Sequence, residues 1–404
     1  MAFDVARVRG LYPALADGYA YLDGAAGTQV PLGVIEAVAD TYRAGIGNQH
    51  GGFPASDRSD AVVAAAREAV ADLVGGTAQG VVLGPNMTTL TYRFATTLAG
   101  TWQPGDEVVV SRLDHDANVR PWVQLADRVG ALVRWAEVDL ETGELPVSQY
   151  ERLLGSRTRL VAVTAASNVL GTRPDVRAIA DLAHAADALV YVDGVHATPH
   201  TPVDMAALGA DFYATSAYKW SGPHVGAVVA DPALLETLRP DKLAPAPDEV
   251  PDRFETGTAP FADLAGVAAA VDHLSGLDDE TAGTRRDRVF ASMTAVEAYE
   301  QAEFARLLDE LADMSHVRLI GCPARRTATV WFRVDGRTPA EVARHLATRR
   351  VNVWNGHNYA WELSGALGLR ETGSAVRAGL VHYNHRADVD RLLDGVASLA
   401  PAAR

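Results

Sequence analysis

From about residue 60 onward, the sequence alternates Ala-rich stretches of helical spacing with short runs of β-branched residues. Residues 60–74 repeat apolar residues at helical spacing and end at a pair of glycines. Runs of nearly continuous apolar character are typical of strands that helices cover on both faces. The strand candidates are residues 81–83, 107–111, 131–135, 159–164, 188–192, 211–215 and 225–229. This alternation predicts an α/β protein with a mostly parallel, seven-stranded sheet.

The alternation of helical stretches and short strands changes after residues 240–251. This segment is rich in Pro and in charged residues, and we interpret it as an exposed connection. We predict helices at 285–314, at 339–349 and from 388 onward, with strands at 316–320, 327–334, 351–354 and 375–383. A chain of 404 residues exceeds the roughly 100–200 residues of one ordinary domain. We therefore expect a large domain over residues 21–265 and a small C-terminal α+β domain over 285–404. An N-terminal arm of residues 1–20 is expected to join the small domain.

Charge and hydropathy limit the classes of partner. The formal net charge is −15, and the arginines do not form a single stripe, so nucleic acid is not an expected partner. No apolar run approaches the ~18 residues that a membrane helix needs, so we expect no membrane partner and a cytoplasmic location. The single cysteine, Cys322, excludes an intramolecular disulfide and any multi-cysteine metal site.

Three predicted strands are followed by polar residues that a purely structural strand end does not need. Asp193 ends one strand, Lys219 follows the next, and His115 follows a third, between Asp114 and Asp116. Ligands of open α/β sheets bind at the carboxyl ends of the strands, so we expect these loops to converge.

The three residue types suit pyridoxal 5′-phosphate (PLP). Desolvation at an apolar strand end allows the Lys219 amine to be neutral near pH 7 and to act as a nucleophile. A carboxylate such as Asp193 keeps the pyridine nitrogen protonated, and the flat ring of His115 can stack on the cofactor. Taken singly, each residue also has a structural interpretation as a cap, a solvated cation or a core histidine. Metal ligation by Asp114 and Asp116 is a further alternative, although no second ligand cluster supports it, and we expect no metal.

At this point the sequence resembles a known family, the fold-type I, class V aminotransferases, and in particular their cysteine desulfurase and selenocysteine lyase branch. The resemblance covers nearly the whole chain. It depends on seven ordered motifs at residues 21–26, 114–118, 167–172, 192–194, 216–223, 253–258 and 376–380.

The resemblance implies a set of cofactor contacts. Lys219 would hold PLP as a Schiff base, Asp193 would bind the pyridine nitrogen, and His115 would stack on the ring. His196 would lie beside the phenolic oxygen, and Asn168 would lie near that oxygen and the substrate. The remaining residues would bind the phosphate: Asn86, Met87, Thr88, Ser216, Tyr218 and, from the second subunit of a homodimer with shared sites, Thr258.

The resemblance also implies a small amino acid as the substrate. Arg377 would bind its α-carboxylate through two parallel hydrogen bonds, a geometry that suits a guanidinium. His50 matches the first of two histidines in a loop on the substrate side. Ala25, Asn168 and Tyr359 complete the expected substrate contacts.

The match ends at the mobile loop that, in cysteine desulfurases, presents a nucleophilic cysteine. Tyr359 occupies that position, and Trp354 replaces a second family arginine. We predict that Cys322 is a packed structural thiol, so no persulfide relay is expected. The leading prediction is β-elimination, of the C–S lyase type, from a small amino acid.

Two alternatives stay open. One is transamination, epimerisation or decarboxylation, with Trp354 and Tyr359 shaping a pocket for a bulkier amino acid. The other is a non-catalytic PLP-binding protein, although the joint retention of Lys219, Asp193, His115 and Arg377 argues against it.

Overall fold

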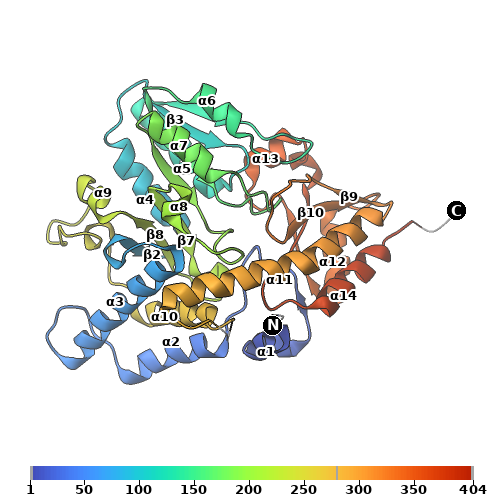
Figure 1. Ribbon diagram of the computed structural model, residues 1–404, viewed down its shortest axis with the longest axis horizontal. Coiled ribbons are helices and arrows are strands. Elements are labelled where there is room, and N and C mark those ends of the chain that lie inside the picture. Colours follow the sequence, from blue (N-terminus) through green and yellow to red (C-terminus); the bar gives the residue numbers. More distant parts are fainter. Residues whose placement is uncertain (1–2, 279–280, 402–404) are drawn as a thin grey trace.

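A seven-stranded sheet forms the centre of the larger part of the molecule, seen in a computed structural model that describes residues 3–278 and 281–401 (Figure 1). The strand order is β2-β8-β7-β6-β5-β3-β4, and β8 alone in this sheet runs antiparallel to its neighbours. The strands are β2 (Val81–Gly84), β3 (Glu107–Ser111), β4 (Leu132–Ala136), β5 (Thr158–Thr164), β6 (Leu189–Asp193), β7 (Phe212–Ser216) and β8 (Gly226–Ala230). The mostly parallel sheet predicted from the sequence is confirmed, and each strand end lies within one residue of its predicted position.

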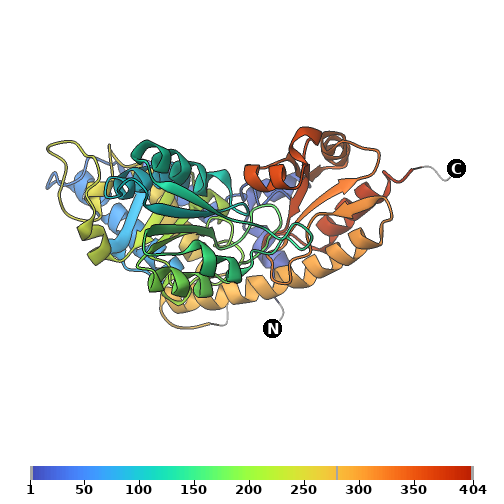
Figure 2. The same cartoon turned by 90° about the horizontal axis from the view of Figure 1, so that it is seen from above.

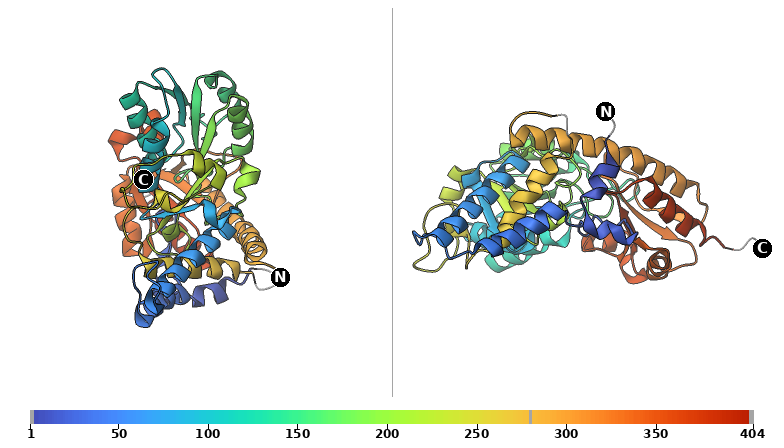
Figure 3. Two further views of the ribbon diagram at one scale, coloured as in Figure 1. Left: turned by 90° about the vertical axis from the view of Figure 1, so that its left-hand side faces the viewer. Right: turned by 90° about the horizontal axis from the view of Figure 1, so that it is seen from below.

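Helices cover both faces of this sheet because successive side chains of a strand point to opposite sides. Val82, Val108 and Tyr191 belong to one core cluster, and the adjacent Val81, Val109 and Val190 belong to another. The first cluster lies beneath α4 (Met87–Ala99), α5 (Arg120–Val129) and α9 (Pro232–Thr237). The second includes residues of α3 (Pro54–Val74), α7 (Val176–Ala185), α8 (Met205–Leu208), α10 (Phe261–Ser275) and the short α6 (Tyr150–Leu153). Helix α2 (Leu32–Ala44) packs beside α10, as does α3 (Figure 3).

A smaller antiparallel sheet of order β12-β13-β10-β9 lies at the other end of the molecule. Its strands are β9 (Val317–Leu319), β10 (Thr329–Val334), β12 (Trp354–Gly356) and β13 (Ala375–Gly379), packed with α12 (Pro339–Thr348) and α14 (Arg386–Ala397). The strand predicted at 375–383 ends early, because Val381 enters a turn in which its N–H donates to Asn384 Oδ1 at 2.8 Å. The strand predicted at 351–354 is divided, since β11 (Val351–Asn352) pairs with β1 (Ala20–Tyr21) and β12 pairs with β13.

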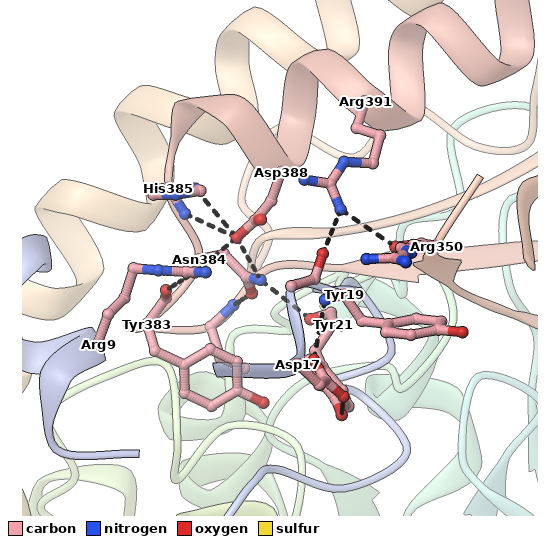
Figure 4. A network of polar contacts seen from close by, with 12 residues as sticks. Arg9, Asp17, Tyr19, Tyr21, Arg350, Tyr383, Asn384, His385, Asp388 and Arg391 are labelled. Carbon is pink, nitrogen blue, oxygen red and sulfur yellow. Dashed lines mark hydrogen bonds and ion pairs between the residues drawn. The ribbon is translucent and has the colours of Figure 1, made fainter. Parts of the chain in front are cut away.

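The long helix α11 (Arg285–Asp313) runs beside both sheets (Figure 2). The N-terminal segment, which includes α1 (Val5–Gly10), is bound to the C-terminal part (Figure 4). Arg9 Nη1 lies 2.7 Å from Asp388 Oδ2, Asn384 Nδ2 donates to the Tyr21 carbonyl at 3.0 Å, and Arg391 Nη1 donates to the Gly18 carbonyl at 2.7 Å. The proposed division into an arm and two domains at 20, 265 and 285 stays a prediction. Within the described residues, no helix is both long and apolar enough to cross a membrane.

Candidate active site

A cavity of about 640 Å³ lies where the carboxyl ends of the large sheet meet the loop after β12. Residues of the large sheet's loops and of α4 and α5 line one part of it, residues of the smaller sheet and the loop after β12 line another, and Ala26 lies after β1. A smaller hollow of about 50 Å³ shares His115, Asn168, Tyr218 and Lys219 with it and reaches Asp193. The structure thus brings together most of the predicted site residues: Met87, Thr88, His115, Asn168, Asp193, His196, Tyr218, Lys219, Tyr359 and Arg377.

Lys219 ends a short helical turn directly after β7. Its Nζ donates a hydrogen bond to the Ala25 carbonyl at 2.5 Å. The pKa of Lys219 is lowered to about 7, chiefly by burial and also by the charge of Arg377, while Asp193 acts in the opposite direction. A substantial fraction of this amine is therefore neutral near pH 7, as a nucleophile toward a carbonyl requires.

Asp193 is the last residue of β6 and is buried. Its Oδ1 accepts a hydrogen bond from the Val195 N–H at 3.0 Å. The pKa of Asp193 is raised to about 6, because the effect of burial exceeds the lowering effects of that hydrogen bond and of Lys219. A Cβ at Gly194 would lie 1.9 Å from Tyr213 Cζ, so only glycine lets the chain turn closely over the Tyr213 ring here. A buried carboxylate is stabilised by a cationic partner, and a protonated pyridine nitrogen would be one.

His115 is held as a neutral ring. Its Nδ1 accepts a hydrogen bond from the Ala117 N–H at 3.0 Å. Burial lowers the pKa of His115 to about 3, with further contributions from the charges of Lys219 and Arg377. The neighbouring Asp114 is fully buried, hydrogen-bonded to Ser111 and, at 2.7 Å, to Asn118, and burial raises its pKa to about 7.

The start of α4 fits a phosphate group. Asn86 caps this helix by accepting the Thr89 N–H at 2.9 Å, and the Met87 N–H donates to Ser216 Oγ at 3.0 Å. Strand β8 passes close beneath, since a Cβ at Gly226 would lie 2.3 Å from the Asn86 carbonyl carbon. Backbone N–H groups at a helix N-terminus favour an anion, and here they border the hollow that contains Asp193 and Lys219.

Asn168 and Arg377 form a buried polar pair beside Lys219. Arg377 Nη1 donates to the Asn168 carbonyl at 3.0 Å, and burial lowers the pKa of Arg377 to about 10, with Asp23 acting in the opposite direction. Among the described residues, the buried Oδ1 of Asn168 has no hydrogen-bond partner. An unpartnered buried acceptor in a cavity wall favours a polar ligand there. His196, whose pKa burial holds well below its usual range, is neutral, and its Nε2 lies 3.1 Å from the hydroxyls of Thr327 and Thr329.

The loop after β12 is bound to the large sheet's loops. The Asp116 N–H donates to the Tyr359 carbonyl at 2.8 Å, and Asn168 Nδ2 donates to the Asn358 carbonyl at 2.7 Å. Asn358 and Tyr359 have φ values of 48° and 60°, in the left-handed region that costs a residue with a Cβ about 1–2 kcal/mol. The loop contacts therefore hold a strained backbone directly over the cavity.

Two predicted site residues lie away from this cavity. His50 is exposed, with its Nδ1 3.5 Å from Asp60 Oδ1, and Thr258 is exposed in the connection before α10. Neither lines the cavity of its own chain within the described residues. Their roles stay predictions.

The packing predicted for Cys322 is wrong, because its side chain is exposed. Gly321, with φ 70°, turns the chain after β9, and the Cys322 N–H donates to the Thr142 carbonyl at 2.7 Å. This contact places the thiol between two surface loops. Cys322 does not line the cavity described above.

Sequence reasoning missed several polar residues of the cavity wall, among them Asp116, Arg120 and His357. Arg120 Nη2 lies 2.8 Å from Asp116 Oδ1 and 2.6 Å from Oε1 of Glu362, which belongs to α13 (Trp361–Ala366). Asp116 is adjacent to His115, and His357 lies two residues before Tyr359. Their proximity to predicted site residues is the sequence feature that indicates a place in the cavity wall.

Comparison with known proteins identifies the family. The family described as aminotransferase class-V matches residues 20–392. The chain belongs to the class V aminotransferase family. A protein of Mycobacterium tuberculosis described as uncharacterized is 41% identical, covering 99% of this chain and 100% of that protein. A cysteine desulfurase of Klebsiella pneumoniae is 32% identical over 98% of each.

Solved structures agree with this class V assignment. The crystal structure of the cysteine desulfurase CsdA from Escherichia coli covers 98% of each chain with a TM-score of 0.86 and 29% identity. The fold-type I resemblance seen in the motifs is thereby confirmed, and the chain is an enzyme of the cysteine desulfurase-like, PLP-dependent class V group.

Proposed function

We propose that this enzyme binds PLP in the cavity and catalyses β-elimination from a small amino acid that carries a sulfur or similar leaving group on Cβ. Lys219 would hold the cofactor, Asp193 would pair with its pyridine nitrogen, and the start of α4 with Ser216 would bind its phosphate. His196 and Asn168 would contact its phenolic oxygen. The neutral imidazole of His115 and the partly neutral amine of Lys219 support this assignment.

When bound, PLP supplies an electron sink for the negative charge that develops at the substrate Cα. Arg377 would hold the substrate carboxylate, because its buried guanidinium offers two parallel donors beside Asn168. Lys219, whose pKa lies near 7, would accept the Cα proton. The Cβ–leaving-group bond would then break, with its electron pair departing on the leaving group, which takes a proton from solvent. The remaining three-carbon fragment would take up water to give pyruvate and ammonia.

The observation that carries elimination is the composition of the cavity wall. Tyr359 stands on the loop where the family resemblance places a nucleophilic cysteine, and the lining residues include no cysteine among those described. Removal of sulfur by a cysteine nucleophile leaves the Cβ electrons with the product, which becomes alanine. Without that nucleophile, the leaving group departs directly and the product is pyruvate.

The test is product analysis of the purified holoenzyme with cysteine and with S-alkyl cysteines. We expect pyruvate together with sulfide or a free thiol, no product from Lys219→Ala, and unchanged pyruvate formation by Cys322→Ser. Alanine as the main product would contradict the proposal. So would a sulfane-sulfur adduct that mass spectrometry maps to the exposed Cys322, because it would indicate a relocated persulfide carrier.

A further inference from the structure

His357 is a polar cavity residue whose ring orientation is fixed. It lines the cavity from the loop between β12 and α13. Its Nδ1 accepts a hydrogen bond from the Tyr359 N–H at 3.0 Å. The ring lies edge-on to Trp361, with centroids 5.3 Å apart at 88°, and edge-on to Tyr359, at 6.0 Å and 89°.

This hydrogen bond also selects the tautomer. A neutral imidazole has one nitrogen that donates and one that accepts. Since Nδ1 accepts the Tyr359 N–H, the proton is on Nε2. Within the described part of the chain, Nε2 has no hydrogen-bond partner. His115 is held by the same device, because its Nδ1 accepts the N–H of Ala117, also two residues further on.

The charged groups of the outer cavity wall, Asp116 and Arg120, are already paired with each other. Arg120 is bound by both Asp116 and Glu362, so its guanidinium is not a free donor for a ligand. Lys219, Arg377 and Asn168 lie at the part of the cavity where the proposed function places the substrate Cα and carboxylate. The Nε2–H of His357, on the loop after β12, is therefore available to the side chain of the substrate.

We infer that the Nε2–H of His357 recognises the substrate side chain by donating to an acceptor oxygen on the atom bonded to Cβ. This inference rests on the proposed function for the orientation of the substrate. It predicts a preference for amino acids whose Cβ substituent carries such an oxygen, as S-alkyl cysteine sulfoxides do, over their unoxidised counterparts. His357 is partly buried and lines the cavity, and a site that offers a donor to a ligand oxygen disfavours the analogue that lacks this oxygen.

Binding of a matched ligand pair tests the inference without requiring elimination. 2-Amino-4-oxopentanoate and norvaline differ at one carbon by a carbonyl oxygen, and neither has a group that can leave from Cβ. Their dissociation constants are measured from the absorbance change of the holoenzyme. We expect the oxo compound to bind about tenfold more tightly than norvaline. The ratio should fall to about one in His357→Phe and should be largely restored in His357→Gln, whose amide N–H replaces the Nε2 donor.

The control is the same pair of substitutions at His345, a partly exposed histidine of α12 whose Nε2 lies 2.9 Å from Ser398 Oγ and which does not line the cavity. Those variants should keep the wild-type ratio. A second readout is ¹⁵N NMR of the protein without cofactor, in which the His357 ring should show a protonated Nε2 and an unprotonated Nδ1.

The outcomes separate the two proposals. A wild-type ratio near one, a ratio unchanged in His357→Phe, a protonated Nδ1, or no binding of either ligand would each overturn the role of His357. The other outcome is a ratio of about ten that is lost in His357→Phe, together with no pyruvate from any cysteine conjugate. It would support the role of His357 and contradict only the proposed elimination.

Discussion

The rings of His115 and Tyr359 stack with their centroids 5.2 Å apart and an angle of 27° between their planes. They come from loops 244 positions apart in sequence, one after β3 and the other after β12. The backbone hydrogen bond from Asp116 to Tyr359 supports the stack, although Tyr359 is 65% exposed. One face of the ring predicted to stack on PLP is thus in contact with the loop on which the family resemblance predicts a cysteine and this chain has Tyr359.

Cofactor capture should follow the ionisation of Lys219. Because the pKa of Lys219 is about 7, the neutral amine is present well below the pH at which an ordinary lysine is neutral. The rate at which the cofactor-free protein forms a borohydride-reducible adduct with PLP should rise from pH 6 and level off above about pH 8. In Arg377→Met the midpoint of this rate profile should move to higher pH. Removing the neighbouring positive charge raises the pKa of Lys219. A rate that keeps rising to pH 10 in the wild type, or an adduct on another lysine in Lys219→Ala, would contradict the assignment.

Asp193→Asn should separate cofactor binding from turnover. The amide keeps the size of the carboxylate but cannot keep the pyridine nitrogen protonated, so we expect turnover to fall by about 100-fold or more while PLP still binds. The comparison is between the dissociation constant for PLP and kcat for pyruvate formation. Unchanged turnover in the variant would remove Asp193 from this role.

Thr258 should act on the cofactor of a second subunit, since it is exposed and lies outside the cavity of its own chain. We expect a homodimer in sedimentation analysis and a several-fold weaker affinity for PLP in Thr258→Ala, with Thr237→Ala on α9 as the control. A monomer that binds PLP fully would contradict shared sites.

Asp114 should make the cofactor-free protein less stable as the pH rises. Its pKa is raised to about 7 from an ordinary value near 3.8, so between about pH 4 and 7 the unfolded chain releases a proton that the folded chain retains. The stability that this group contributes is fully present below pH 4 and is lost as the pH rises toward 7. From pH 4.5 to 7.5, the urea midpoint of the wild type should therefore fall relative to that of Asp114→Asn, which keeps the hydrogen-bonding shape without the charge. Parallel curves for the two proteins would show that Asp114 does not titrate in this range.

The sequence alone determined the large sheet and the inner part of the site. Strand positions depend on local apolar runs, and the carboxyl ends of parallel strands meet at one edge, so Asp193, Lys219 and His115 could be placed together before any contact was known. The outer wall was decided only by the tertiary structure. Two contacts join segments far apart in the chain: the ion pair of Arg120 with Glu362 and the backbone hydrogen bond from Asp116 to Tyr359. No local sequence pattern encodes such contacts. The exposure of Cys322 was also decided by the tertiary structure. The backbone of Cys322 binds the surface loop at Thr142, and this contact keeps the residue out of the core.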